Sequence, residues 1–175
     1  MRRPPPSLQS RAVAWLAQRE HSRTELRSKL RRAAQRQAEA AGLEDPAAAR
    51  AAGPAAEIEQ LLDLLQAKGL LSDERFAESR VRVRAAGQGT RRIQAELARH
   101  GLKLAQQPLQ QLRDSELQRA LQLWRRRFGR PAPDARERAR QMRFLAGRGF
   151  DAEVIRKVVG DAPSAEDADP AEGPA

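Results

Sequence analysis

The sequence predicts an all-α fold, a tandem array of three three-helix repeats with about nine helices in an elongated and curved molecule. Three observations support this prediction. Apolar residues recur at helical spacing, and Ser, Thr or Asp stands where helices begin while glycine stands where they end. In addition, residues 95–102 align without gaps on residues 143–150, and both share a Leu-x-x-x-Gly-apolar core with residues 65–70. This internal similarity favours repeats that bury their core at neighbouring interfaces, and independent three-helix modules joined by linkers are the alternative.

The first repeat is expected over residues 7–72, after a flexible N-terminal segment at residues 1–6 that contains three consecutive prolines. Ser7 is placed to cap its first helix. Ser22 and Glu25 have the spacing of a capping box, in which the hydroxyl and the carboxylate satisfy N–H groups at the start of the second helix. A second helix is therefore expected after a sharp turn.

An Ala-rich insertion at about residues 33–56 interrupts the first repeat. Leu43 is its one sizeable apolar residue, so the stretch buries too little surface to hold a fixed position. We expect a helix end followed by a loose linker. The apolar pattern then resumes in a third helix, which is expected to end at Gly69. Its buried face is predicted to comprise Ile58, Leu61, Leu62 and Leu65.

The second repeat, expected over residues 73–113, contains two short basic helices joined by a tight turn. Ser72 is placed to cap the first helix and Thr90 to cap the second. The Gly-Gln-Gly segment at residues 87–89 lies between them. No strand precedes it, so a helix-to-helix turn that needs positive φ is favoured over a phosphate-binding loop. A weaker helix follows, with Pro108 near its first turn.

The third repeat is expected over residues 114–160. Asp114 is predicted to cap its first helix, Asp134 the second, and Asp151 to start a short last helix. Helical spacing predicts two buried faces, formed by Leu117, Leu121, Trp124 and Phe128 in the first helix and by Ala135, Ala139, Met142 and Leu145 in the second.

Charge is unevenly distributed along the chain. The formal net charge is +10, but residues 161–175 carry five acidic residues and no basic one, so residues 1–160 carry about +15. This acidic tail is poor in apolar residues and contains proline, which predicts disorder. The positive excess of the rest indicates a polyanion or an acidic protein surface as the partner.

Arginines form stripes at helical spacing in four of the expected helices. Solvated charge explains any single stripe about as well as binding does. Four stripes with few intervening acids favour an anionic partner, because like charges on adjacent turns repel. The candidate contact residues for such a partner are Arg75, Arg80, Arg82, Arg84, Arg91, Arg92 and Arg99. A secondary basic surface is predicted from Arg119, Arg126, Arg136, Arg140 and Arg143.

Catalysis is not expected. The chain has no cysteine and no tyrosine. Its two histidines, His21 and His100, stand next to predicted helix ends without nearby carboxylate or histidine spacing that suits a metal. We therefore predict no catalytic residue, metal or cofactor. No apolar run approaches the roughly 20 residues that span a bilayer, so no membrane is expected. The lack of cysteine suits the reducing cytoplasm. We also expect a monomer.

Base recognition is also disfavoured. The arginine helices lack a set of Asn and Gln residues for reading base edges, so any contacts with nucleic acid are expected to be non-specific and made to phosphates. Four aromatic residues could stack on bases, but their regular spacing with leucines favours core packing. These residues are Trp15, Trp124, Phe128 and Phe150.

Residues 70–102, LLSDERFAESRVRVRAAGQGTRRIQAELARHGL, resemble the hallmark segment of the RecX family, small regulators of the RecA recombinase. Residues 73–77 match its Asp-x-Arg-Phe-Ala motif and residues 89–93 its Gly-x-x-x-Ile continuation. Residues 145–150, with Ile155, resemble its C-terminal Leu-x-x-Arg-Gly-Phe segment and the isoleucine that follows. The likeness extends over roughly residues 10 to 160.

The resemblance implies three-helix repeats and a non-enzymatic protein that binds the RecA filament on single-stranded DNA and restrains its ATPase, strand-exchange and co-protease activities. The Ala-rich insertion and the acidic tail depart from the family pattern. We also expect the tail to screen the basic surface. Two other functions remain open from the residues alone: a non-specific DNA-binding or architectural helical protein, and a helical adaptor without DNA contact.

Overall fold

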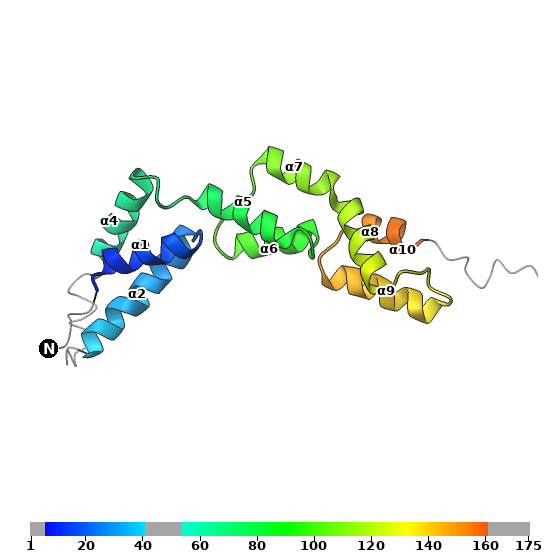
Figure 1. The fold of residues 1–175 in the computed structure, drawn as a ribbon, viewed down its shortest axis with the longest axis horizontal. Helices are drawn as coiled ribbons and strands as arrows, with labels where there is room; N and C mark the ends of the chain where they lie inside the picture. The colour runs from blue at the N-terminus through cyan, green and yellow to red at the C-terminus, as the bar shows by residue number, and fades with distance from the viewer. Residues whose placement is uncertain (1–5, 41–53, 161–175) are drawn as a thin grey trace, which may run out of the picture. The chain divides into compact units, whose positions relative to one another are not determined.

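The computed structural model describes residues 6–40 and 54–160, and these residues form helices and no strand (Figure 1). The all-α prediction is thus confirmed. The predictions for residues 1–5, 41–53 and 161–175 lie outside the described residues. The helices, labelled as in Figure 1, are α1 (Leu8–Gln18), α2 (Arg23–Ala40), α4 (Pro54–Ala67), α5 (Asp73–Arg84), α6 (Thr90–Ala98), α7 (Gln106–Asp114), α8 (Glu116–Arg127), α9 (Ala135–Gly147) and α10 (Ala152–Val159).

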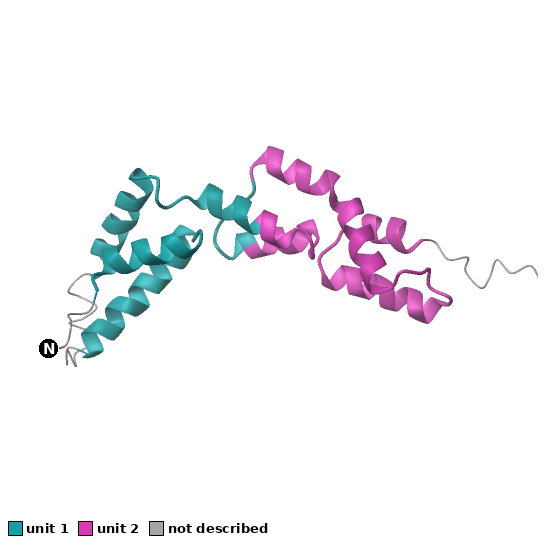
Figure 2. Ribbon diagram, in the orientation of Figure 1, with its two compact units in different colours: residues 1–80, 97–104 teal, residues 81–96, 105–175 magenta. Residues whose placement is uncertain are grey.

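The chain divides into two compact units (Figure 2). Unit 1 comprises residues 1–80 and 97–104, and unit 2 comprises residues 81–96 and 105–175. The boundary therefore passes through α5 and α6. Among the described residues, no helix combines the length and hydrophobicity that crossing a bilayer requires.

The core of unit 1 lies among α1, α2 and α4. Ile58 and Leu62 are at most 1% exposed and Leu65 is 2% exposed, as the spacing predicts, whereas Leu61 is partly buried at the edge of the cluster. Trp15 also packs against this core, which confirms that it is a packing residue. The other buried members of the cluster are Ala12, Leu26, Leu30 and Leu71.

The core of unit 2 lies among α8, α9 and α10. The buried members of its cluster are Ala120, Trp124, Leu145, Phe150, Ile155, Val158 and Val159. Leu121, Phe128 and Met142 are partly buried against it, but Leu117 and Ala135 are exposed, so the predicted faces are wrong at those two positions. In α8 the buried face is centred on Ala120 and Trp124.

The start of α8 also differs from the prediction. Asp114 is the last residue of α7 and does not cap α8, which begins at Glu116. Ser115 joins the two helices with helical backbone angles, φ −83° and ψ −5°. Its hydroxyl donates back to the carbonyls of Gln111 and Leu112, at 2.9 and 3.2 Å, and so caps the end of α7. Because the chain stays helical through Ser115, there is no extended residue at which a cap could form.

The other predicted serine and aspartate caps are confirmed. Each hydroxyl or carboxylate accepts a hydrogen bond from a backbone N–H in the first turn: Ser7 from Ser10, Ser22 from Glu25, Ser72 from Arg75, Asp134 from Glu137 and Asp151 from Glu153. The capping box at Ser22 differs in its second half, because the Glu25 carboxylate binds the guanidinium of Arg19 and lies 3.1 Å from Nδ1 of His21. A charged donor is a stronger partner for a carboxylate than a backbone N–H.

Candidate functional site

Several arginines of unit 1 are neutralised by neighbouring acids. Arg23 pairs with Glu59 at 2.8 Å and with Asp63 at 2.7 Å, and Arg27 pairs with Glu59 at 2.5 Å. Hydrogen bonds from Arg27 and Arg23 lower the pKa of Glu59 to about 2. These pairs connect α2 to α4, so their positive charge is already compensated within the unit.

Three candidate residues of the second repeat lie in unit 1. Arg75 donates to the Glu20 carboxylate and to the Gly69 carbonyl, both at 2.9 Å, so its guanidinium holds the turn before α5. Arg80 lies 5.0 Å above the ring of Phe76. Arg99 is exposed, and no ion pair with a described residue engages it.

The other four candidates of the second repeat lie in unit 2. Arg84 pairs with Glu96 at 3.2 Å, and Arg91 pairs with Asp151 at 2.7 Å. Arg92 donates to the carbonyl of Gly147 at 2.8 Å. Arg82 is exposed, and no described acid pairs with it. The predicted set therefore contains two kinds of residue: guanidiniums that bind other parts of the chain, and guanidiniums that face solvent.

The Gly-Gln-Gly segment between α5 and α6 forms the predicted helix-to-helix turn, but glycine is needed there for a different reason than the predicted positive φ. Neither Gly87 nor Gly89 has positive φ. Instead, a Cβ on Gly89 would lie 2.2 Å from the carbonyl oxygen of Gly149. The Gly89 N–H donates to the Arg148 carbonyl at 2.9 Å, and the Arg91 N–H donates to the Gly149 carbonyl at 3.2 Å. Glycine is required because two backbones touch there.

Glu116 closes the same junction from α8, and the sequence reasoning missed it. Its carboxylate accepts from the backbone N–H of Thr90 at 2.9 Å and from the Thr90 hydroxyl at 2.8 Å. The Asp151 N–H reaches the same carboxylate at 3.3 Å. The prediction that Thr90 caps α6 is therefore wrong. Thr90 instead donates to the Glu116 carboxylate, which caps α6 from another helix. No local pattern marks this role, since Thr90 and Glu116 are 26 residues apart.

Arg119 also has an internal role. Its Nη1 donates to the carbonyls of Ala85 and Gln88, at 2.9 and 2.7 Å, and its Nη2 donates to the carbonyl of Leu112 at 2.7 Å. Burial lowers the pKa of Arg119 against the opposing effect of Glu116. Because its donors are used on the turn after α5 and the end of α7, we leave Arg119 out of the candidate surface.

The rest of the predicted secondary surface lies on α8 and α9. Arg126, Arg136, Arg140 and Arg143 are exposed, and Arg140 pairs with Glu137 at 3.1 Å. Three further exposed arginines, Arg125, Arg127 and Arg130, were missed. The run RRRFGR at residues 125–130 is the signal that could have identified them.

Both histidines have structural surroundings. His21 is 1% exposed and lies beside Glu25, a nearby carboxylate that the prediction did not expect; burial lowers the pKa of His21 despite that carboxylate. His100 lies against Ser22, whose hydroxyl is 2.9 Å from its Nδ1, and contacts the edge of Phe76. In the described ranges no three His, Asp or Glu residues lie close enough together to hold a metal ion.

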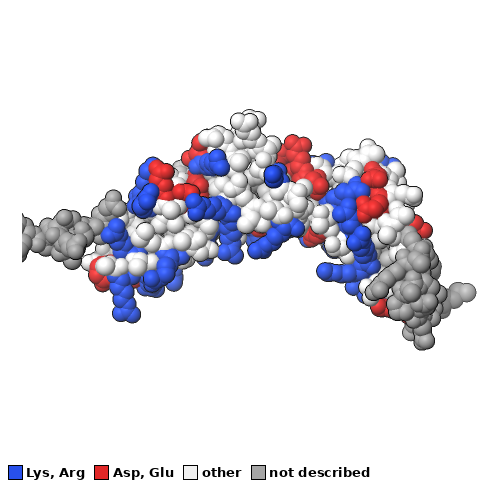
Figure 3. Space-filling model, turned by 180° about the vertical axis from the view of Figure 1, so that it is seen from behind, with Lys and Arg blue, Asp and Glu red and all other residues white. Residues whose placement is uncertain are grey.

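Positive charge is concentrated in unit 2. Its described residues include 17 Lys and Arg and 7 Asp and Glu, a net +10, whereas those of unit 1 include 13 and 9, a net +4. Figure 3 shows that Lys and Arg side chains are widespread on the face it presents, with acidic side chains between them. The geometry offers exposed guanidiniums on helices, a surface suited to phosphates or carboxylates.

Two family models match the chain. The second three-helix domain of RecX matches residues 72–103, and the third matches residues 114–159. The regulatory protein RecX of Leptothrix cholodnii is 47% identical over 159 residues, which cover 90% of both chains. That of Ralstonia nicotianae is 42% identical over 159 residues, covering 90% of this chain and 89% of the relative.

A solved structure supports the fold as well. The crystal structure of RecX from Lactobacillus salivarius matches with a TM-score of 0.57 at 17% identity, and the match covers 87% of this chain and 92% of that chain. At this identity the likeness concerns the fold, an all-α repeat of three-helix domains.

Proposed function

Because the chain belongs to the RecX family of regulatory proteins, we propose that it binds the RecA filament on single-stranded DNA and inhibits the ATPase, recombinase and co-protease activities of RecA. The family relationship carries this proposal. The exposed guanidiniums and the net +10 of the described part of unit 2 support it, since a nucleoprotein filament presents phosphates and acidic side chains together.

The proposed mechanism is non-enzymatic and needs no cofactor. A monomer in the cytoplasm would contact DNA phosphates and acidic surface of RecA at once, and so would impede subunit rearrangement or filament growth. Arg82 and Arg99 are the best contact candidates of the second repeat, because both are exposed without an ion pair to a described residue. Arg84, Arg91 and Arg92 would have to leave an internal partner to reach the filament.

The test is the steady-state ATPase rate of the cognate RecA on single-stranded DNA, titrated with this protein at two salt concentrations. We expect inhibition at amounts well below the RecA concentration, because a protein that blocks filament growth or rearrangement acts on many subunits. Inhibition that begins only when the protein coats the DNA would contradict the proposal and indicate simple competition for DNA.

The uncompensated charge of unit 2 also favours a second candidate, a non-specific DNA-binding protein. Such a protein would displace any DNA-bound protein equally. A single-strand-binding protein on the same DNA is therefore the matched control for the RecA titration, and equal effects on both would favour this second candidate.

A further inference from the structure

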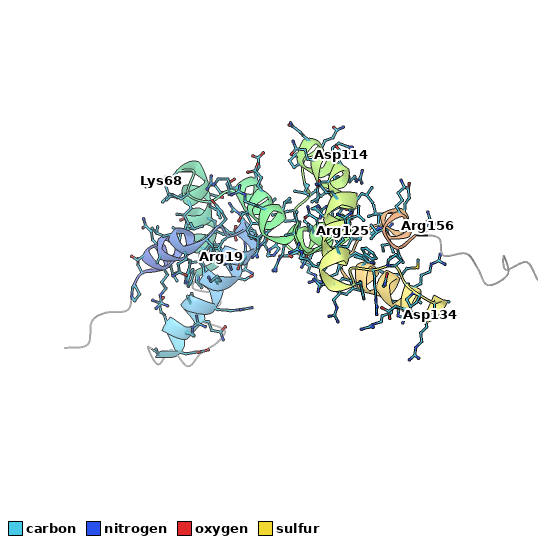
Figure 4. All side chains as sticks on the ribbon, turned by 45° about the vertical axis from the view of Figure 1, so that its right-hand side comes forward. Arg19, Lys68, Asp114, Arg125, Asp134 and Arg156 are labelled. Atoms are coloured by element: carbon cyan, nitrogen blue, oxygen red, sulfur yellow. The ribbon has the colours of Figure 1, made fainter. Side chains whose placement is uncertain are left out.

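The end of α8 and the loop after it carry a group of unpaired cations. We call these residues, Arg125, Arg126, Arg127 and Arg130, the arginine corner. All four are exposed, and none forms an ion pair with a described residue. Figure 4 shows Arg125 on α8 and Asp134 near the start of α9, which bound this part of unit 2. Four like charges within six residues repel each other unless an anion lies between them.

Two hydrogen bonds made by the buried side chain of Gln141 hold the backbone of the arginine corner in place. The indole Nε1 of Trp124 donates to Oε1 of Gln141 at 2.8 Å, and Nε2 of Gln141 donates to the Arg130 carbonyl at 3.4 Å. Gln141 is 1% exposed and Trp124 is 9% exposed. The loop is therefore tied to α9, and the four guanidiniums project from a scaffold with a defined position.

The acids nearest to the corner in sequence have other partners. Asp134 caps α9 through the Glu137 N–H at 2.7 Å, and the Glu137 carboxylate pairs with Arg140. Asp114 accepts from the side chain of Gln110 at 2.8 Å. Glu116 is buried at the Thr90 junction. The described residues thus leave the charge of the arginine corner uncompensated.

The chain itself contains an acidic segment whose charge is similar in size to that of the arginine corner. Residues 161–175 carry five acidic residues and no basic one, and they follow α10 directly. Within unit 2, α10 packs against both α8 and α9. Fifteen residues can extend to about 50 Å, and the twelve residues of α8 are about 18 Å long, so the tail can reach either end of α8.

We propose that the acidic tail at residues 161–175 binds the arginine corner and competes there with an anionic partner. Carboxylates are suitable ligands for guanidinium groups, which they bind through paired hydrogen bonds. A tethered segment also acts at an effective concentration in the millimolar range, which favours the tail over free anions. The binding of the tail does not depend on the proposed function. Its consequence, weaker binding of the protein to DNA phosphates, rests on that function.

Paramagnetic broadening tests the contact in the full chain. The protein has no cysteine, so Ala168→Cys allows a single nitroxide label between Asp167 and Asp169. We expect the label to broaden the backbone amide signals of residues 125–130 at low salt. The signals should recover at about 0.5 M salt, where the Debye length falls to roughly 4 Å. Absence of broadening at the corner, or equal broadening at exposed Arg31 and Arg32 of α2, would overturn the proposal.

A neutralised tail supplies the matched control for this experiment. The variant carries Asn in place of the three aspartates and Gln in place of the two glutamates of residues 161–175, and it keeps the length of the segment. We expect it to abolish the broadening. Broadening that persists at the corner in this variant would contradict an electrostatic contact.

Competition is tested by anisotropy of a labelled single-stranded oligonucleotide. At low salt the neutralised tail should raise affinity about tenfold in the otherwise wild-type chain. The gain should fall to about twofold or less when Arg126→Gln and Arg127→Gln are also present, but stay near tenfold with Arg31→Gln and Arg32→Gln, the same charge change in unit 1. Equal gains in both backgrounds would show that the tail acts through net charge and would overturn the proposal. Failure to inhibit RecA, with these results intact, would count against the proposed function alone.

Discussion

Glu116, the first residue of α8, caps the amino terminus of α6 by accepting hydrogen bonds from both the backbone N–H and the hydroxyl of Thr90. Glu116 is 4% exposed, and a buried carboxylate is stable only when donors surround it. The dipole of α6 and the Asp151 N–H supply further stabilisation. The residue is thus an internal cap that joins three helices of unit 2.

The same relationship occurs in unit 1. Asp73, the first residue of α5, accepts at 2.7 Å from the N–H of Arg23, the first residue of α2. The corner between α1 and α2 also binds the turn after α6, because the Thr24 hydroxyl donates to the His100 carbonyl. In unit 2 the corner between α5 and α6 binds Arg148, which aligns with His100 in the internal repeat. The two junctions therefore use equivalent positions.

Replacing Glu116 should destabilise the fold. Glu116→Gln keeps the shape of the side chain but removes the charge and points one amide NH₂ at donors, so we expect a loss of about 1 to 3 kcal/mol in the free energy of unfolding. Urea denaturation at pH 7 measures it. Glu153→Gln, at an exposed pair with Lys157, is the control and should change stability by at most about 0.5 kcal/mol. Equal effects would contradict the buried cap.

Gly89 and Gly147 should respond in opposite directions to alanine. Gly89→Ala places a Cβ 2.2 Å from the Gly149 carbonyl oxygen, so the two backbones must separate, and we expect a loss of roughly 2 to 4 kcal/mol. A Cβ at Gly147, the last residue of α9, meets no atom within 4 Å. Gly147→Ala should therefore be neutral or stabilise by up to about 1 kcal/mol. Thermal denaturation of both variants measures these changes. A Gly89→Ala variant as stable as the wild type would contradict the close approach of the two backbones.

Arg119 should matter for stability more than for binding. Lysine keeps the charge of Arg119 but cannot reach the carbonyls of Ala85, Gln88 and Leu112 together, so Arg119→Lys should cost about 1 to 3 kcal/mol. Affinity for single-stranded DNA should stay within about twofold at a temperature where the variant is folded. Weaker DNA binding without a change in stability would return Arg119 to the contact surface.

Acid should weaken unit 1 through Glu25. Burial alone raises the pKa of Glu25, but hydrogen bonds from Arg19 and His21 outweigh it and lower the pKa from 4.5 to about 2. A carboxyl whose pKa is lower in the folded than in the unfolded state stabilises the fold above about pH 5, and this contribution is lost as pH falls towards 2. The stability difference between wild type and Glu25→Gln should shrink over that range in urea titrations. Glu78→Gln, at an exposed position of α5, controls for the loss of one charge, and a difference that does not change with pH would contradict the assignment.

Exposed arginines should control binding without affecting the fold. Arg82→Glu with Arg99→Glu should weaken binding to RecA filaments about tenfold or more at low salt and lower the slope of log affinity against log salt by roughly 2, because two phosphate contacts are lost. Melting temperature should stay within about 2 °C. Lys68→Glu with Lys103→Glu makes the same change in net charge and serves as the control. An equal loss of binding in both pairs would assign the effect to net charge.

Reversing Arg84 and Arg92 instead would mix binding with stability. Arg84 pairs with Glu96, and Arg92 is bound to the Gly147 carbonyl, so a glutamate at either position loses an internal partner. The sequence offered no basis for this distinction. Stripes of arginine look alike along a helix, whether or not another helix supplies an acceptor.

The sequence by itself determined the helices and most of their ends. Ser22, Ser72 and Asp134 act within one turn of their own position, and glycines such as Gly69 and Gly149 adopt positive φ at helix ends, so a local pattern was sufficient. Helical spacing likewise identified Trp124 and other core residues. Where prediction failed, at Asp114, Ser115 continued the helix and used its hydroxyl for the preceding turn.

Only the tertiary structure decided which polar residues hold the repeats together and which remain available. Thr90 meets Glu116 across 26 residues, Arg92 reaches Gly147 across 55, and Gly89 contacts Gly149 through backbone atoms. Such contacts depend on how neighbouring three-helix domains pack, and packing is set by the sum of many apolar contacts far apart in the chain. The sequence does not show whether a charged side chain binds a carbonyl, pairs with an acid or faces water, because these surroundings form only when the helices pack together.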